Sequence, residues 1–294
     1  MLKDLHSLVV DNLANLNEND KNEALASLES GRVVYFPNLS FEFNEVQTNA
    51  LLRPDILDGK HKNISFDYQT QKLGGFKKEE PQLVAPLAEL MQNYAEFARQ
   101  LVDTTFPQYQ SYLLWGRTSY RPAEIKGRPS SKRKDDTRLH VDSFPASPVN
   151  GKRILRVFCN VNPNNHARIW HLGEPFEVIL ERFAKQIPAY NKTLARLLKW
   201  TKTTKSLRSA YDHYQLKLHD TMKLDDDYQT KVNKNRIDFP ALSTWVVFTD
   251  EVSHAALGGQ FLLEQTFYLP VDAMATPALS PLKRWEKLKD NNLA

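Results

Sequence analysis

Apolar residues recur at helical spacing in the first third of the chain, at residues 23–28 and 83–101. Between these segments, residues 32–36 form a short apolar run that ends at Pro37, which is the pattern of a β-strand. Residues 1–108 are therefore predicted to form a mixed, mainly helical support lobe.

The pattern changes from residue 109 onward, where short β-rich segments alternate with turns that contain Pro, Gly and Asn. This alternation is typical of an all-β barrel. We therefore expect an α+β protein whose core, residues 109–272, is a double-stranded β-helix of the jelly-roll or cupin type, followed by a tail at residues 273–294. The β-rich segments are residues 112–115, 118–120, 137–142, 154–161, 244–248 and 261–269.

Residues 174–235 interrupt this core with apolar residues three and four apart, so a helical insertion is predicted. Basic residues accompany its leucines and Trp200. A helix that packs on the barrel explains this pattern most simply, and a helix that lies on an anionic inner membrane is the alternative. The basic residues are Lys192, Arg196, Lys199, Lys202, Lys205 and Arg208.

The composition narrows the class of protein. A hydrophobic fraction of 41% and a charged fraction of 25% are those of a soluble globular protein, and no segment approaches the roughly 20 apolar residues of a membrane span. Cys159 is the single cysteine, which excludes an internal disulfide and favours the cytoplasm. A net charge of +4 is too small to indicate nucleic acid, and no feature predicts a protein partner.

The strongest chemical signal is the triplet His140-Val141-Asp142 in one of the β-rich segments. Side chains two apart on a strand leave from the same face, so both can reach one ion. Downstream, His254 lies between two further β-rich segments and supplies a third ligand. Two imidazoles and one carboxylate form the facial triad of non-haem iron(II) oxygenases, which leaves coordination positions for cosubstrate and O2.

The competing explanation is that such a triplet arises by chance and that each histidine is packed or solvated. The β-rich context on both sides and the lack of a zinc motif favour the triad. The other histidines are predicted to be structural or exposed because they lie in the support lobe, in a loop or in the insertion. They are His6, His61, His166, His171, His213 and His219.

A 2-oxoglutarate-dependent enzyme also needs a cation for the distal carboxylate of its cosubstrate. Many such barrels place an arginine about ten residues after the distal histidine, but this sequence has Gln265 there. Arg156, a charge within an apolar strand, is the predicted replacement, although it could instead face solvent or pair with the insertion. This placement, with the hydroxyl of Thr137, locally resembles the JmjC-type asparaginyl hydroxylases.

Three longer segments resemble the bacterial Kdo 3-hydroxylases: HVDSFPASPVNGKRILRVFCNVNP, RIWHLGEPFE and SHAALGGQFLLEQTFYLP. The resemblance implies that His140, Asp142 and His254 bind Fe(II), with 2-oxoglutarate and O2 as cosubstrates and ascorbate as reductant in vitro. It also implies hydroxylation at C3 of 3-deoxy-D-manno-oct-2-ulosonic acid (Kdo) in Kdo-containing lipid A, a lipopolysaccharide precursor, to give D-glycero-D-talo-oct-2-ulosonic acid (Ko).

An acceptor that bears carboxylates and phosphates would favour cations around the barrel mouth. The basic loop at residues 122–136, with Arg128, could supply them together with Arg117 and Arg121, although a charge run is as often a solvated surface. Two other functions stay open: a 2-oxoglutarate-dependent hydroxylase of a protein side chain or small molecule, and a non-catalytic cupin-like binding module.

Overall fold

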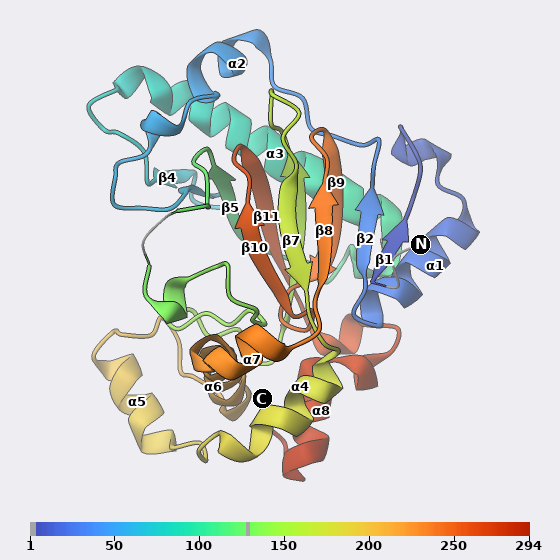
Figure 1. Cartoon of the computed structure of the whole chain (residues 1–294), viewed down its shortest axis with the longest axis vertical. Coiled ribbons are helices and arrows are strands. Elements are labelled where there is room, and N and C mark those ends of the chain that lie inside the picture. Colours follow the sequence, from blue (N-terminus) through green and yellow to red (C-terminus); the bar gives the residue numbers. More distant parts are fainter. Residues whose placement is uncertain (1–3, 128–129) are drawn as a thin grey trace.

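An eight-stranded mixed sheet forms the centre of the molecule in the computed structural model, which describes residues 4–127 and 130–294 (Figure 1). Its strand order is β1-β2-β9-β6-β11-β5-β3-β4. The β1–β2 pair is parallel and the other pairs are antiparallel. The strands are β1 (Leu5–Ser7), β2 (Val33–Phe36), β3 (Ile64–Asp67), β4 (Lys72–Gly74), β5 (Leu114–Arg121), β6 (Arg153–Asn160), β9 (Ser243–Phe248) and β11 (Leu262–Leu269).

A second, three-stranded antiparallel sheet has the order β10-β7-β8. Its strands are β7 (Arg168–Leu172), β8 (Asn235–Phe239) and β10 (His254–Gly258). Aromatic side chains fill the space between the two sheets. Phe239 stacks on Trp245 of the larger sheet with ring centroids 4.0 Å apart, and Trp170 meets Phe158 edge-on at 5.0 Å.

Helices from the N-terminal third cover the larger sheet. The longest, α3 (Val84–Thr105), buries an apolar face that includes Leu87, Met91 and Leu101. Its Tyr94 hydroxyl reaches the carbonyls of Val157 and Leu263, so this helix is fixed to β6 and β11. The other N-terminal helices are α1 (Glu18–Glu29), which begins at a capping box on Asn17, and α2 (Glu45–Leu51).

Four helices of the insertion and one C-terminal helix gather at one end of the sheets (Figure 1). The Trp285 indole donates to the Gln215 side chain and ties α8 to α6. The residues predicted as a C-terminal tail thus include a helix. The five helices are α4 (Phe176–Phe183), α5 (Lys192–Trp200), α6 (Ala210–Leu224), α7 (Asp226–Lys231) and α8 (Pro281–Lys289).

The mixed α+β class predicted from the sequence is confirmed. The predicted segment at residues 137–142 differs, because its backbone forms an isolated bridge and no regular strand. The backbones of His140 and His254 exchange hydrogen bonds, whereas the Asp142 N–H donates to the Thr249 carbonyl. The segment therefore pairs with two different neighbours. Within the described residues, no helix is both long and apolar enough to cross a membrane.

Candidate active site

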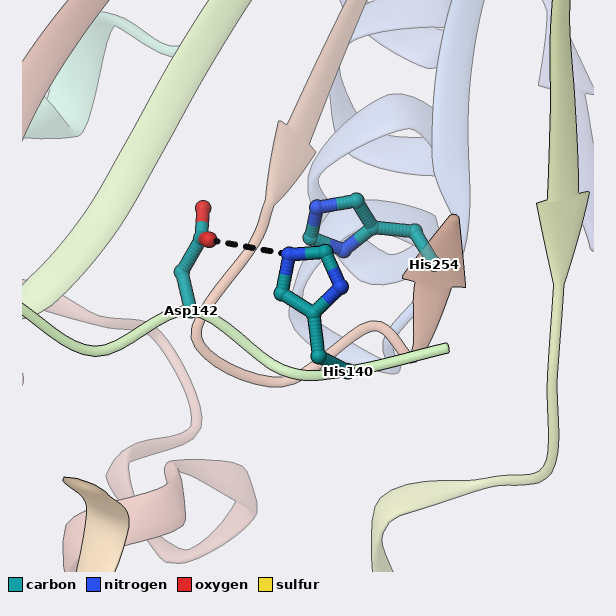
Figure 2. Close-up of side chains that lie close together, drawn as sticks. All are labelled: His140, Asp142 and His254. Atoms are coloured by element: carbon teal, nitrogen blue, oxygen red, sulfur yellow. Dashed lines mark ion pairs between the residues drawn. The ribbon is translucent and has the colours of Figure 1, made fainter. Parts of the chain in front are cut away.

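His140, Asp142 and His254 lie together where the bridge joins β10, as Figure 2 shows. Each residue offers one ligand atom, and these atoms lie within 4.8 Å of one another. The His140 N–H donates to the His254 carbonyl at 3.0 Å, and the His254 N–H donates to the His140 carbonyl at 2.9 Å. The backbone therefore sets the spacing of the two histidines, and the structure brings together the three residues predicted from the sequence.

The two imidazoles have the protonation and orientation that a metal requires. In each ring Nδ1 contacts a carbonyl oxygen, that of Arg138 for His140 (2.7 Å) and that of Val252 for His254 (2.8 Å). A carbonyl only accepts, so Nδ1 carries the proton and Nε2 is free to bind an ion. Burial lowers the pKa of His254 and lowers that of His140 to about 3, so both rings are neutral near pH 7.

Asp142 supplies the carboxylate. Burial alone would raise its pKa, but Arg156 and the two histidines hold that pKa well below the usual range, so the group is ionised. Its Oδ1 lies 3.6 Å from Nε2 of His140, and its buried Oδ2 has no hydrogen-bond partner in the described part of the chain. Two neutral imidazole nitrogens and an unsatisfied carboxylate oxygen fit a divalent iron centre.

A cavity of about 160 Å³ adjoins these three side chains. Among the described residues, three arginines and three carboxylates line it, so these charges balance. A bound divalent metal would add two positive charges, which a dianion such as 2-oxoglutarate would neutralise. The charged residues of the lining are Arg121, Arg156, Arg168, Asp136, Asp142 and Glu264.

Arg156, the predicted cosubstrate cation, lies in this cavity with 11% of its side chain exposed. One terminal nitrogen is 3.3 Å from Oδ2 of Asp142, and the other is 3.2 Å from Oε1 of Glu264. Arg121 also pairs with Glu264, at 3.0 Å. The Arg156 side chain therefore points into the cavity, as a cosubstrate-binding residue must. Its guanidinium already forms ion pairs with the carboxylates of Asp142 and Glu264.

Arg168 begins β7 and is a cavity residue that the sequence analysis missed. Only 2% of it is exposed, its Nη1 donates to the Gly259 carbonyl at 2.8 Å, and no carboxylate of the described residues lies within salt-bridge distance. Burial and then the charge of Arg121 lower its pKa to about 9, so it is still charged near pH 7. An arginine opening the apolar run RIWHL is the signal that could have identified it.

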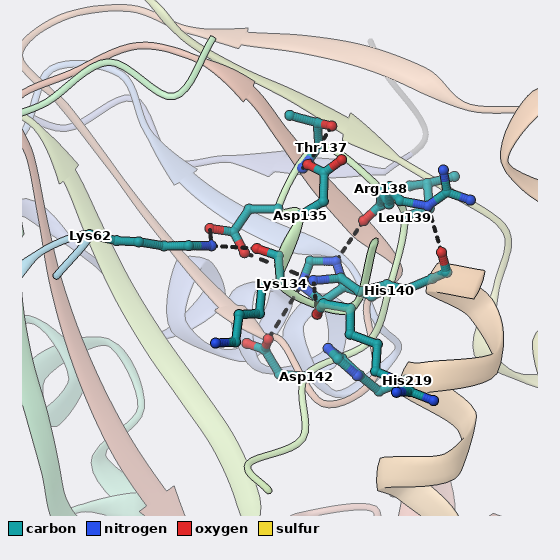
Figure 3. Close-up of polar contacts among 12 residues, drawn as sticks. Lys62, Lys134, Asp135, Thr137, Arg138, Leu139, His140, Asp142 and His219 are labelled. Carbon is teal, nitrogen blue, oxygen red and sulfur yellow. Dashed lines mark hydrogen bonds and ion pairs between the residues drawn. The ribbon is translucent and has the colours of Figure 1, made fainter. Parts of the chain in front are cut away.

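Other predicted residues lie elsewhere. Thr137 is exposed and its hydroxyl donates to Asp135 at 2.7 Å, away from Asp142 along the same segment (Figure 3). Arg117 pairs with Asp67 at 3.4 Å and lines a different cavity. Arg128 lies outside the described residues.

Gln265, which replaces the expected arginine, is fully buried and makes no contact with the triad's cavity. It accepts from the Thr118 hydroxyl at 2.6 Å. Its neighbour Glu264 faces the cavity instead, because successive residues of a strand point to opposite faces. About ten residues after the distal His254, this chain therefore presents the Glu264 carboxylate to the cavity. Many related barrels present an arginine guanidinium there.

Helix α6 of the insertion reaches the triad through His219. This ring meets His140 edge-on, with centroids 5.4 Å apart, and Figure 3 shows it beside His140 on the helix side. Its Nδ1 lies 3.1 Å from an oxygen of Asp220. Of the two predicted alternatives, structural or exposed, the exposed one does not hold, because only 9% of His219 is accessible.

The similarity to known proteins agrees with the metal site that the geometry indicates. Residues 12–292 match the family model described as 3-deoxy-D-manno-oct-2-ulosonic acid (Kdo) hydroxylase. No curated protein matches.

Solved structures extend this similarity to the whole fold. The crystal structure of a Kdo hydroxylase, a non-haem Fe(II) α-ketoglutarate-dependent dioxygenase, in complex with cobalt(II) is 43% identical, with a TM-score of 0.95 over 99% of this chain and 97% of that one. The complex of such an enzyme with α-ketoglutarate and Fe(III) is 42% identical, with a TM-score of 0.94 over 99% and 98% of the two chains.

Proposed function

The chain belongs to the Kdo hydroxylase family of non-haem Fe(II)/2-oxoglutarate-dependent dioxygenases, and we propose that it hydroxylates C3 of Kdo in Kdo-containing lipid A to give Ko. The observation that carries the proposal is the side-by-side placement of an Fe(II)-type triad and a cavity of balanced charge, which would suit a dianion once a divalent metal is bound. The resemblance to this family that three sequence segments suggested is confirmed over nearly the full chain.

We propose further that the two sheets form a double-stranded β-helix within residues 109–272. Its larger sheet would consist of four adjacent strands, β5, β11, β6 and β9. The His140 segment, β10, β7 and β8 form the smaller sheet, because the bridge continues that sheet by one segment. Residues 174–235 are then an insertion between β7 and β8, and the support lobe at residues 1–108 widens the larger sheet with β1 to β4.

The triad residues have one role each in the proposed reaction. His140 and His254 would bind iron through Nε2, while their Nδ1–H groups hold the rings on backbone carbonyls. Asp142 would bind through its carboxylate, with Oδ2 otherwise unsatisfied. With iron bound, 2-oxoglutarate and O2 supply the oxidising power that replaces a C–H bond by C–OH, with succinate and carbon dioxide as products.

We propose that Arg156 and Arg168 hold 2-oxoglutarate. Arg168 is the stronger anchor for a carboxylate because, among the described residues, no carboxylate lies within salt-bridge distance of its buried charge. The indole N–H of Trp170 also lines this cavity, is buried and has no partner among the described residues, so it can donate to the same ligand. A contact with Thr137 stays a prediction and would require its hydroxyl to leave Asp135.

We propose that the insertion places the protein on the cytoplasmic surface of an anionic membrane. Helix α5 buries Ala195 but leaves Trp200 81% exposed and Leu194 and Leu197 each 50% exposed. A packed helix would hide these side chains, so their exposure favours the membrane alternative. No Asp or Glu lies between Glu181 and Asp212, whereas basic residues recur throughout that stretch.

The deciding assay is succinate release with Kdo-containing lipid A, Fe(II), 2-oxoglutarate and ascorbate. We expect turnover that requires the acceptor, with a product heavier by one oxygen at C3. His140→Ala should abolish it, whereas His213→Ala, a histidine remote from the cavity, should not. If the wild-type protein consumed 2-oxoglutarate at the same rate with or without the Kdo acceptor and formed no hydroxylated sugar, the acceptor assignment would be wrong.

A further inference from the structure

A second cavity, of about 530 Å³, lies at the end of the sheets where β5 begins and β11 ends. This volume is within the range of sites that hold sugars and other small ligands. Three cations and one carboxylate line it: Arg117, Lys152, Lys205 and Asp67. The mechanism described above uses none of these residues.

One strand face connects this cavity with the triad's cavity. On β11, Glu264, Thr266 and Tyr268 are two residues apart and therefore share a face. Glu264 lines the triad's cavity and Tyr268 lines the second one. Thr266, between them, pairs with Arg156, which contacts Asp142. The second cavity thus continues the strand face that holds the metal site.

Tyr268 marks the boundary between the two cavities. Burial raises the pKa of its phenol, while the charges of Arg156 and Arg117 act in the opposite direction. The phenol is therefore within electrostatic reach of one arginine from each cavity. It stays protonated near pH 7 and is available to donate a hydrogen bond.

A β-bulge brings Arg117 to the cavity. Gln265 pairs with Thr118 and Phe267 pairs with Trp115, so Gly116 and Arg117 together oppose Thr266. The bulge requires glycine at residue 116, because a Cβ there would lie 2.6 Å from the Thr266 carbonyl oxygen. The extra residue of a bulge changes the direction of a neighbouring side chain, and here that side chain is Arg117.

Two loops joined by hydrogen bonds supply the lysines. The Lys205 N–H donates to the Ala146 carbonyl at 2.9 Å, and Nη2 of Arg208 donates to the Pro145 carbonyl at 2.8 Å. This fixes the loop after α5 against residues 143–152. In the described chain no carboxylate lies within salt-bridge distance of Lys152 or Lys205, so both ammonium charges are free for a ligand.

We propose that this cavity binds the carboxylate-bearing sugar of the acceptor, with Lys152, Lys205 and Arg117 on its anionic groups and Tyr268 on a hydroxyl. The proposal rests on the function proposed above and adds to it the place and residues of acceptor recognition. The sugar would then lie along the β11 face that also carries Glu264 of the triad's cavity.

The test uses Kdo-containing lipid A whose acyl chains have been removed by alkali, so that membrane binding plays no part. Titration of this fragment into protein loaded with Co(II) and 2-oxoglutarate measures binding without turnover. We expect Lys152→Ala and Lys205→Ala each to weaken fragment binding about tenfold, and the double variant more, because each loses a charge-assisted contact. Binding of 2-oxoglutarate should not change.

Lys185→Ala is the matched control, since Lys185 is an exposed lysine of the insertion outside the cavity. Thermal unfolding of each variant verifies that it folds, and Lys205→Gln offers a second variant that removes the charge but keeps a polar side chain. A double variant that folds and binds the fragment as tightly as wild type overturns this site while leaving the hydroxylase function intact. A wild-type protein that neither binds the fragment nor hydroxylates the lipid overturns both proposals.

Discussion

Arg156 lies beside Asp142, with a guanidinium nitrogen 3.3 Å from Oδ2, the carboxylate oxygen that has no hydrogen-bond partner among the residues described. The same guanidinium reaches Glu264 at 3.2 Å. One side chain therefore contacts a proposed iron ligand and also lines the cavity proposed for the cosubstrate. The metal and cosubstrate halves of the site are joined through this residue.

Replacing Arg156 should change the binding of both ligands, in opposite directions. We expect Arg156→Ala to raise the 2-oxoglutarate dissociation constant by about tenfold to a hundredfold, because a charge-assisted hydrogen bond contributes on the order of 1.5–3 kcal/mol. Fe(II) binding should tighten, since a divalent cation no longer meets the positive charge of the guanidinium beside Asp142. Anaerobic titrations of each ligand measure the two effects, with the exposed Arg182→Ala as control. Unchanged 2-oxoglutarate binding would reassign the cation.

Replacing Arg168 should lower the affinity for 2-oxoglutarate but raise the stability of the ligand-free protein. Arg168→Met keeps most of the side-chain volume but removes a buried charge that has no carboxylate of the described residues within salt-bridge distance, so 2-oxoglutarate binding should fall by about tenfold or more. The ligand-free protein should become more stable, because burying a charge without a direct ion pair is costly. Thermal unfolding without ligands tests this, and a lower melting temperature for the variant would contradict it. Metal binding without 2-oxoglutarate should not weaken, because the variant removes a positive charge from the same cavity.

Acid should destabilise the protein through Asp136. Burial raises the pKa of this carboxyl, but Arg121, Lys62 and Lys223 lower it to about 2, below its ordinary value of 3.8. A folded-state pKa below the unfolded one contributes stability that is present above about pH 4 and is lost as the pH falls towards 2. Chemical unfolding from pH 6 to pH 2 should therefore show a shallower decline for Asp136→Asn than for Asp238→Asn, an exposed control. Parallel curves would count against this role.

The exposed face of α5 should bind anionic vesicles. We expect co-sedimentation with phosphatidylglycerol vesicles, little with phosphatidylcholine, and weakening by salt because surface charges are screened. Trp200→Ser and Arg196→Glu should each reduce binding, the latter by about tenfold, since each basic residue contributes on the order of 1 kcal/mol at such a surface. Lys231→Glu, on α7, is the control. Equal binding to both vesicle types would refute the electrostatic interpretation.

The metal ligands could be predicted from the sequence because their geometry is local. His140 and Asp142 are two residues apart in extended backbone, which places both side chains on one side whether or not a regular strand forms. The distal His254 was identifiable because β-rich segments flank it. Helix α3 was also predictable, since its buried positions follow the helical period over many turns.

The rest of the site depends on contacts between distant segments. Arg168 and Glu264 face the same cavity because β7 and β11 belong to different sheets that meet there, and pairing between strands is invisible in a local pattern. Strands β7, β8 and β10 were missed because each is only five residues long. Helix α8 was missed because its packing partner, Gln215, is 70 residues away.

The balanced charges of the triad's cavity make its two ligands interdependent. A dianion that entered before the metal would meet no net attraction there, and a metal that entered alone would leave two positive charges uncompensated. Each ligand should therefore bind more tightly when the other is present, and thermodynamic linkage requires the two enhancements to be equal. Iron and 2-oxoglutarate would then load cooperatively, so that a half-filled site, in which oxygen chemistry could run without control, would be rare.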